Sequence, residues 1–408
     1  MRTLISINNY YYRRGGAEVV FLEQNKLFEE IGWQVVPFAM SHPKNQSSPW
    51  NDFFVDEIEF GHSYNAWQKA IMAGKIIYSF EARNKLSLLL DKARPNIAHA
   101  HNIYHHISPS ILSLLKQRGI PVVLTAHDLK LACPAYKMLN RDGICERCKT
   151  GNFFNVVVHR CVQDSLLVSG LVFTETLVHR LLHLYRDNLD RIIVPSRFFE
   201  QKLAEWGWPK EKLIYIPNFI RTTQLEPQFE PGDYFVYFGR LGPEKGLRTL
   251  VAAAIEAGVR LKVVGTGPLH AELRAAAGAV GDKIEFLGYQ HGEKLWSIVR
   301  GSRAVVLPSE WYENAPISLM EGYALGKPLI GANIGGITEL IQENKTGFSF
   351  EAGNISALAA SLRRMSDIPG SEIAEMGREA HDWMGNSFSG ELYRDRLLQV
   401  YGTLASNK

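Results

Sequence analysis

The sequence predicts an α/β protein with two Rossmann-like, doubly wound domains that face a cleft. Short apolar runs alternate with amphipathic stretches, which is typical of parallel sheets covered by helices. At 408 residues the chain is too long for one ordinary hydrophobic core. The alternation also restarts at Tyr234, after a polar, proline-containing segment from Arg221 to Asp233. Two domains are therefore expected, over residues 1–220 and 221–388.

Strands are expected where apolar residues form short continuous runs, because the strands of a parallel sheet are buried on both faces. The first domain has such runs at Thr3–Ile7, Gln34–Phe38, Ile97–Ala100, Val122–Thr125, Arg191–Pro195 and, at a late edge, Leu213–Ile216. The second domain has them at Tyr234–Arg240, Leu261–Val264, Ile284–Leu287, Ala304–Leu307 and Pro328–Gly331. A helix from Gly16 to Ile31 follows the first strand. The last helix, residues 389–404, has a partly apolar face and is expected to pack back onto the first domain.

The composition is that of a globular protein, with 46% hydrophobic and 21% charged residues. Lys and Arg outnumber Asp and Glu by 26 to 20 in residues 1–220, whereas the remaining residues have 19 against 22. A mildly basic first half suits an anionic ligand or a membrane surface, although such a spread is also ordinary. No stretch has the ~18–20 apolar residues of a membrane span. We expect a cytoplasmic protein without a nucleic-acid partner, and membrane association stays open.

Two carboxylates, Glu313 and Glu321, lie eight residues apart across an expected strand–loop–helix junction. Pro316 suits the first turn of the helix, where its missing N–H costs nothing. Hydrogen-bond donors at the positive end of this helix would favour an anion. The residues concerned are Asn314, Ala315, Pro316 and Ile317. Two carboxylates with an anion site between them match a sugar, a phosphate and a ribose, although helix capping and solvation explain most isolated pairs of this kind.

Arg240 and Lys245 lie on one loop that follows the first strand of the second domain. Arg binds phosphate bidentately and Lys acts as a point charge, so the loop suits a diphosphate. A solvated basic loop is the alternative. Three weaker signals accompany it: Gly16 beside the first helix, the Gly265-Thr266-Gly267 turn, and the strand end at Glu285 and Leu287, whose backbone could contact a nucleotide base.

His127 follows the strand Val122–Thr125, where a side chain can face the cleft and contact a substrate hydroxyl. A structural histidine is the usual alternative. Four further histidines surround the preceding strand end, and no carboxylate accompanies them at a spacing that suggests a metal site. They are His99, His101, His105 and His106.

All four cysteines of the chain fall within one loop, at Cys133, Cys145, Cys148 and Cys161. A Cys-x-x-Cys pair with outer partners twelve to thirteen positions away is compatible with a structural zinc site. Reduced thiols, or disulfides formed on oxidation, are the competing explanations.

The stretch from Asn155 to Arg191 interleaves apolar residues with Arg and His. Such a pattern suits contact with an anionic bilayer. A core-facing helix with a solvated polar face is the commoner explanation, and both stay open.

These motifs together resemble family 4 of the retaining nucleotide-sugar glycosyltransferases, which have the two-domain GT-B architecture. The resemblance covers nearly the whole chain, from Gly15-Gly16-Ala17-Glu18 and Thr125-Ala126-His127-Asp128 to Gly239-Arg240-Leu241, Glu313-x₇-Glu321 and Gly335-Gly336. The Glu-x₇-Glu segment is its most specific part. The cysteine-bearing loop resembles a subset of bacterial enzymes in surface-polysaccharide assembly.

The resemblance implies a division of roles within a donor site. Arg240 and Lys245 would bind the donor diphosphate, which the amides of residues 314–317 would support. Glu313 would contact the hydroxyls of the donor sugar, and Glu321 would bind the ribose.

For the first domain the resemblance implies that His127 contacts the donor sugar near the reacting carbon and that Gly16 approaches the diphosphate. The residues expected to act directly in catalysis are His127, Arg240, Lys245 and Glu313.

The implied activity is a retaining hexosyl transfer from a UDP- or GDP-linked sugar to a glycan or polyprenyl-linked saccharide in polysaccharide biosynthesis. The leaving phosphate would take the proton of the acceptor, so no protein nucleophile is needed. No Asp-x-Asp triplet occurs in the chain, so we expect no metal or other cofactor to be required for catalysis. A nucleotide-sugar epimerase of the same fold and a non-catalytic nucleotide-sugar-binding protein are the alternatives.

Overall fold

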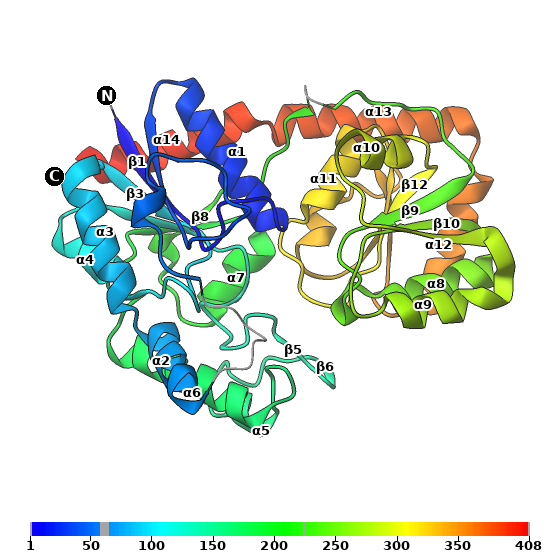
Figure 1. Ribbon diagram of the computed structural model, residues 1–408. Coiled ribbons are helices and arrows are strands. Elements are labelled where there is room, and N and C mark those ends of the chain that lie inside the picture. The colour runs from blue at the N-terminus through cyan, green and yellow to red at the C-terminus, as the bar shows by residue number, and fades with distance from the viewer. Residues whose placement is uncertain (1, 58–64, 223–224, 407–408) are drawn as a thin grey trace. The chain divides into compact units, whose positions relative to one another are not determined.

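The computed structural model describes residues 2–57, 65–222 and 225–406 (Figure 1). The chain divides into two compact units. Unit 1 comprises Met1–Ile216 with Tyr393–Lys408, and unit 2 comprises Pro217–Leu392. Each unit contains one six-stranded sheet whose strands all pair in parallel. The predicted α/β class with two parallel-sheet domains is thereby confirmed.

The sheet of unit 1 has the strand order β2-β1-β3-β4-β7-β8. Its strands have the bounds of the predicted apolar runs, except that the last two strands each end one residue earlier than predicted. They are β1 (Thr3–Ile7), β2 (Gln34–Phe38), β3 (Ile97–Ala100), β4 (Val122–Thr125), β7 (Arg191–Val194) and β8 (Leu213–Tyr215). The chain direction across the sheet reverses between β1 and β3. Ligands of doubly wound sheets bind at such a switch point, outside the carboxyl ends of the strands.

Serine side chains fix where three helices of unit 1 begin, because Ser79, Ser165 and Ser196 each accept a hydrogen bond from a first-turn amide. The helices are α1 (Gly16–Glu30), α2 (Ala66–Ile77), α3 (Phe80–Ala93), α4 (Ser110–Gln117), α5 (Asn155–Val158), α6 (Leu166–Leu181), α7 (Arg197–Glu205) and α14 (Gly390–Ser406), with 3₁₀ turns η1 (Asn51–Phe53) and η2 (Lys210–Lys212). A small hairpin, β5 (Leu139–Asn140) with β6 (Gly143–Ile144), lies in the cysteine-bearing loop.

The sheet of unit 2 has the order β11-β10-β9-β12-β13-β14, which is that of a dinucleotide-binding Rossmann fold. Its switch point lies between β9 and β12. The strands are β9 (Tyr234–Phe238), β10 (Arg260–Val264), β11 (Ile284–Gly288), β12 (Ala304–Leu307), β13 (Leu329–Ala332) and β14 (Gly347–Phe350). The sequence analysis did not predict β14, which is an edge strand.

The helices of unit 2 are α8 (Leu247–Ala257), α9 (His270–Ala277), α10 (Gly292–Arg300), α11 (Ile317–Ala324), α12 (Ile355–Asp367) and α13 (Gly370–Ser387), with 3₁₀ turns η4 (Pro243–Lys245), η5 (Gly278–Lys283) and η6 (Gly335–Leu340). Helix α11 begins one residue after Pro316, which is its N-cap. The expectation that Pro316 lies inside the first turn is therefore wrong by one position. The proline contributes no N–H to the helix end.

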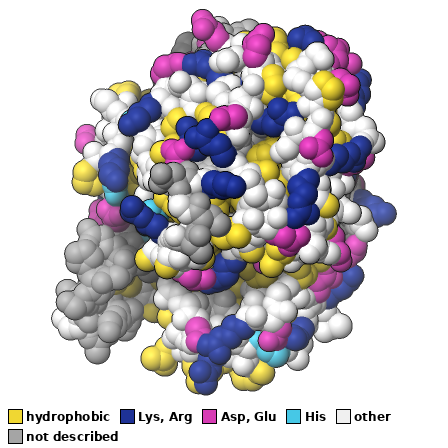
Figure 2. Space-filling view, turned by 90° about the vertical axis from the view of Figure 1, so that its right-hand side faces the viewer, with side chains coloured by type: hydrophobic (Ala, Val, Ile, Leu, Met, Phe, Trp, Pro, Cys, Tyr) yellow, Lys and Arg dark blue, Asp and Glu magenta, His cyan; other side chains and the backbone are white. Residues whose placement is uncertain are grey.

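One face of the molecule is shown in Figure 2, where Lys and Arg side chains alternate with Asp and Glu and with scattered apolar groups. Nucleic-acid surfaces gather basic side chains on one face. The described residues of the face in Figure 2 form no such single-sign patch.

Candidate active site

The loops that follow β9 and β12 carry the charged residues predicted for the second domain, and both lie at the switch point of the unit 2 sheet. Arg240 comes two residues after β9, and Lys245 ends the 3₁₀ turn η4. Glu313 lies in the loop between β12 and α11. The Nζ of Lys245 donates to Glu313 Oε1 at 2.6 Å. The structure therefore joins two residues that are 68 positions apart in the sequence.

Glu313 is 6% exposed, so its charge depends on partners rather than on water. Ser309 Oγ also donates to its Oε1, at 2.6 Å. Burial by itself would raise the pKa of the Glu313 carboxyl, but the charge and hydrogen bond of Lys245, with the hydrogen bond from Ser309, outweigh burial and hold the pKa below its usual value. Glu313 is consequently an ionised hydrogen-bond acceptor at neutral pH, and it has no proton to give to a leaving group.

Two glycines let the backbone pack tightly around this pair. Gly246 has a φ of +66°, and a Cβ there would lie 1.8 Å from the carbonyl oxygen of Pro308. Gly335 has a φ of +58°, and a Cβ there would lie 2.5 Å from the carbonyl oxygen of Glu313. Only glycine combines a left-handed φ with such close contacts. The glycines hold the loops after β9, β12 and β13 against one another.

Arg240 forms an ion pair with Glu244, a residue that the sequence analysis did not single out. The Arg240 side chain is 55% exposed, whereas that of Glu244 is 3% exposed. The buried carboxylate therefore anchors the guanidinium at the start of the loop, and the rest of its N–H groups stay accessible. The amide of Glu310 also donates to the carbonyl of Glu244, at 3.0 Å, which ties η4 to the loop after β12.

The other residues of unit 2 that the sequence analysis predicted for a donor site include a group at and around the start of α11. Ala315 and Ile317 are buried, while Asn314 and Pro316 are partly exposed. Glu321 lies on α11, one turn after its start, and is also partly exposed. Asn218 Nδ2 donates to the carbonyl of Ala315 at 2.9 Å and orients this segment.

Glu285 and Leu287 lie on the edge strand β11 and are both partly exposed. Glu285 is at the amino end of the strand, where its Oε1 lies 3.9 Å from Arg260 Nη2. Leu287 is near the carboxyl end, and the carbonyl of the next residue, Gly288, accepts from the Gly265 amide at 2.7 Å. Of the two, Leu287 lies nearer the carboxyl edge of the sheet, where Rossmann-type sheets generally bind ligands.

In unit 1, His127 belongs to a stack of three imidazole rings at the carboxyl ends of β3 and β4. Its Nε2 lies 2.8 Å from His101 Nδ1, and the His101 ring stacks on that of His99. Burial lowers the pKa of His127 to about 4 and that of His99 to about 3. The stack is therefore uncharged at neutral pH, and His127 contributes hydrogen bonds rather than a positive charge.

Buried hydrogen-bonding groups hold the His99 ring of this stack in place. His99 Nε2 lies 2.7 Å from Thr125 Oγ1, and its Nδ1 lies 2.5 Å from the hydroxyl of Tyr401 on α14. Tyr393, also on α14, donates to Gln24 Oε1 at 2.7 Å. The last helix thus fixes the ring of His99, on which His101 stacks, and His127 stacks in turn on His101.

The other two clustered histidines have separate partners. His105 Nδ1 lies 3.4 Å from Glu175 Oε1, and His106 Nε2 lies 3.2 Å from the hydroxyl of Tyr10. Among the described residues, no three His, Cys, Asp or Glu side chains stand close enough to hold a metal ion as they are.

Gly16 is the first residue of α1, which follows β1 at the switch point of the unit 1 sheet, and it is exposed. Glu18 in the same first turn is buried, and burial raises the pKa of its carboxyl. The sequence analysis quoted Glu18 within the glycine motif but assigned it no role.

Helix α6 buries mostly polar side chains, together with Val172, and exposes several leucines. Glu175 is fully buried and pairs with Lys130 at 2.8 Å, and the buried His179 lies 2.7 Å from the carbonyl of Ile77. On the other side Leu167 is 88% and Leu181 69% exposed. The core-facing explanation of the 155–191 pattern holds for Val172, which is buried in a cluster with Ala135 and Val156, whereas the exposed leucines leave contact with a bilayer open.

The comparisons with known proteins agree with this architecture. The model of Glycosyltransferase Family 4 matches residues 14–224, just over half of the chain, and that of glycosyl transferases group 1 matches residues 222–383. The chain belongs to Glycosyltransferase Family 4. It is a glycosyltransferase at the level of this family, and an epimerase or a non-catalytic binding protein is not favoured.

Relatives of this family 4 chain include the D-rhamnosyltransferase WbpZ of Pseudomonas aeruginosa, 33% identical over 50% of the chain and 56% of that protein. A glycogen synthase of Mycobacterium tuberculosis is 29% identical over 85% of the chain and 77% of its own length. The chain thus spans little more than half of WbpZ. Among solved structures, Anabaena HepE in complex with UDP has a TM-score of 0.66 at 14% identity, covering 99% of this chain and 100% of HepE. This similarity shows the GT-B fold.

Proposed function

We propose that this chain is a retaining glycosyltransferase that moves a hexose from a UDP- or GDP-linked donor to a glycan or lipid-linked saccharide in polysaccharide biosynthesis. The observation that carries the proposal is the buried Lys245–Glu313 pair at the switch point of a Rossmann-type sheet. A crevice at such a point is where these sheets bind nucleotides. A family relative named as a glycogen synthase and a structural neighbour in complex with UDP are consistent with this assignment.

The diphosphate of the donor would lie against Arg240 and Lys245. The ammonium of Lys245 has three N–H donors. One of them is directed to Glu313, which leaves donors for phosphate oxygens. Arg240 presents a planar fork that matches two phosphate oxygens. The amides that begin α11 would add partial positive charge, without any contribution from Pro316.

Glu313 would accept hydrogen bonds from hydroxyls of the donor sugar, and Glu321 from the ribose. Glu285 and Leu287 would flank the base, with Leu287 nearer to it. In unit 1, Gly16 would offer its backbone to the diphosphate and neutral His127 would donate a hydrogen bond to the sugar.

The chemistry we propose needs no protein nucleophile. The bond between the anomeric carbon and the diphosphate oxygen breaks, the acceptor oxygen bonds to the same face of that carbon, and the acceptor proton passes to the departing phosphate. Positive charges at the phosphate stabilise the leaving group as its charge develops. Arg240 and Lys245 would supply this stabilisation in place of a metal ion, so we propose metal-independent turnover.

A panel of UDP- and GDP-sugars, assayed for release of the nucleoside diphosphate with and without EDTA, tests the proposal. We expect release with one donor class, retention of anomeric configuration in the product, and no loss of rate in EDTA. Absence of release with every donor would favour a binding protein, and interconversion of the sugar without transfer would favour an epimerase. Loss of release in EDTA would contradict metal independence.

The acceptor would be anionic and lipid-linked. A cavity of about 270 Å³ beside α6 is lined by basic and aromatic side chains, among them Lys130, Lys149, Arg180, Arg186, Phe153 and Trp208. The buried hydroxyl of Tyr185, which also lines it, has no hydrogen-bond partner among the described residues. An unpaired donor among cations suits a phosphate of the acceptor.

The exposed leucines of α6 would rest on the bilayer that carries this acceptor. No helix of the described chain is long and apolar enough to cross a membrane. A surface helix with an apolar outer face beside basic residues is suited instead to an anionic membrane surface. We place the protein in the cytoplasm at that surface, where its four unpaired thiols are chemically stable.

Replacing Leu167 and Leu181 by glutamate should lower binding to anionic vesicles at least tenfold, because each exposed leucine buried in lipid is worth roughly 1.5–3 kcal/mol at full burial. Co-sedimentation with phosphatidylglycerol-containing and purely zwitterionic vesicles measures this. Leu88, an exposed leucine on α3, provides the matched control Leu88→Glu. Equal binding by all three proteins, or no binding to either vesicle, would contradict membrane contact through α6.

A further inference from the structure

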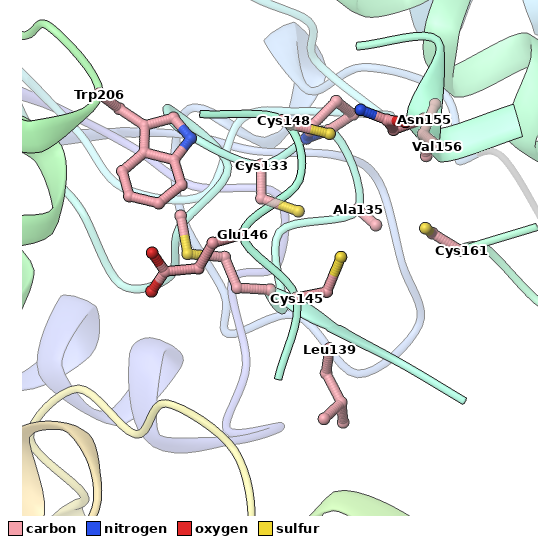
Figure 3. A pocket seen from close by; sticks show the side chains of 12 residues that line it. Cys133, Ala135, Leu139, Cys145, Glu146, Cys148, Asn155, Val156, Cys161 and Trp206 are labelled. Carbon is pink, nitrogen blue, oxygen red and sulfur yellow. The ribbon is translucent and has the colours of Figure 1, made fainter. Parts of the chain in front are cut away.

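The four cysteines of the chain line one small cavity of unit 1, although they are spread along the loop between β4 and α6. Their sulfur atoms are directed toward a common space (Figure 3). None of them is in a disulfide. We call this group, Cys133, Cys145, Cys148 and Cys161, the cysteine cluster.

Three separate segments supply the cluster. Cys133 follows β4, Cys145 and Cys148 come directly after the β5–β6 hairpin, and Cys161 lies in the turn between α5 and α6. The amide of Cys145 donates to the carbonyl of Met138 at 2.8 Å, which docks the second segment on the first. A ligand shared by the four thiols would therefore connect three segments of the chain that backbone hydrogen bonds join only weakly.

The backbone around Cys133 forms a tight turn. The amide of Cys133 donates to the carbonyl of Leu129 at 2.7 Å, and the amide of Tyr136 donates to the carbonyl of Cys133 at 2.9 Å. Tyr136 and Met138 adopt left-handed conformations, with φ of 54° and 46°. The turn therefore brings Cys133 close to Met138, on which the segment of Cys145 docks.

The cavity itself has room for one small occupant. Its volume is about 10 Å³, close to the space that one water molecule needs. Much of the lining is apolar, including Ala135, Met138 and Val156. A water molecule there would find thiols as its main partners, which are weak hydrogen-bonding groups. A metal ion would use all four.

The guanidinium of Arg147 stands beside the cluster, with its Nη1 3.8 Å from the sulfur of Cys145. A divalent ion with four thiolates carries a net charge of −2. Arg147 would offset part of that charge.

We propose that the cysteine cluster binds one structural Zn²⁺ ion in a tetrahedral site. Four cysteine ligands with no open position are typical of structural zinc. The sulfurs are not at ligand distances as they stand, so binding would draw them in to about 2.3 Å from the ion. Each thiol would lose its proton to solvent on coordination. The ion would fix the loop before α6 and thereby position the helix that carries Glu175 and the exposed leucines.

Metal analysis of the full-length protein, purified without chelators or added metal, is the first test. We expect about one zinc per chain and slow reaction of the thiols with a disulfide reagent until a chelator is added. Substitution with Co²⁺ should give the intense thiolate-to-cobalt absorption of a tetrahedral four-sulfur site. Neither readout depends on the transfer reaction, so failure of the zinc site and failure of the proposed function are distinguishable.

The double variant Cys145→Ser/Cys148→Ser should lose the zinc, and the control Met138→Leu should retain it. Met138 lines the same cavity but offers no thiolate, and its backbone amide is unchanged in the control. If the double variant does not fold, the wild-type zinc content and the cobalt spectrum still decide the matter. Less than about half a zinc per chain in wild-type protein, zinc that persists in the double variant, or mass-mapped disulfides within the cluster would overturn the proposal.

Discussion

Lys245→Ala should lower kcat/KM by about 10²–10³-fold, the usual loss when one charge-stabilising group is removed from an active site. The variant removes a cation from the proposed diphosphate site and leaves the buried carboxylate of Glu313 without its ion-pair partner. Steady-state kinetics with the accepted donor measures the loss, and calorimetry with the free nucleoside diphosphate should show weaker binding. Circular dichroism should still show a folded protein.

Two further variants test whether this loss is specific to the Lys245–Glu313 pair. Arg248→Ala removes a cation of the same unit whose pair with Glu272 is about half exposed, and surface pairs of this kind contribute little. It should keep near-wild-type kinetics. Glu313→Gln keeps the shape of the side chain, so it should lose turnover with a smaller loss of stability than Lys245→Ala. Wild-type turnover in both Lys245→Ala and Glu313→Gln would remove these residues from the active site.

Lys130→Ala should lower the free energy of unfolding by about 3–5 kcal/mol, because breaking a buried ion pair leaves an uncompensated charge. The Lys130 and Glu175 side chains are 7% and 0% exposed. Lys149→Ala is the matched control, since Lys149 lines the same cavity but pairs with Glu205 at the surface, and it should cost less than about 1 kcal/mol. Chemical unfolding of the three proteins measures the difference. Equal stabilities would show that Glu175 does not depend on this pair.

The same pair predicts an acid dependence of stability. Burial alone would raise the pKa of Glu175, but the charge of the neighbouring Lys130 ammonium outweighs burial and lowers it to about 2. A depressed pKa stabilises the folded state above the unfolded pKa of about 4.5, and this stability is lost as the pH falls through about 4.5 toward 2. Glu175→Gln should therefore flatten the decline of unfolding free energy in that range, whereas an unchanged slope would contradict the assignment.

Most strands of the two six-stranded sheets could be predicted from the sequence, because they are buried on both faces and appear as continuous apolar runs. Four strands of unit 1 match their predicted bounds without change. The missed strand, β14, has Phe348 and Phe350 buried on either side of an exposed Ser349. An edge strand of four residues in which buried and exposed side chains alternate does not form a continuous apolar run. The search for such runs therefore did not predict β14.

The positions of Arg240, Lys245 and Glu313 at strand ends followed from motif spacing, but their partners did not. Glu244 lies in the same loop as Arg240, and nothing in the sequence marks it as the buried carboxylate. The pair of Lys130 with Glu175 joins residues 45 positions apart. Such contacts depend on how loops and helices pack, and a single sequence carries no record of that packing.

Helix α6 shows the limit of pattern reasoning most clearly. Its leucines recur at helical spacing, which normally marks a buried face. The structure places Ser169, Val172, Glu175 and His179 inward instead. The inward polar groups find partners in Lys130 and in backbone carbonyls, so burial of a polar face is tolerated here.

The tyrosines of α14 have a consequence for how the protein is made. Tyr393 and Tyr401 complete the interior of unit 1, yet a ribosome adds them only after the residues of unit 2. Domains usually fold in the order of synthesis, the N-terminal one first. Here the histidine stack of unit 1 lacks two of its supporting hydroxyls until translation has passed through all of unit 2. A nascent chain halted after unit 2 should thus contain a first domain that has all the strands of its sheet but still lacks Tyr393 and Tyr401 in its interior.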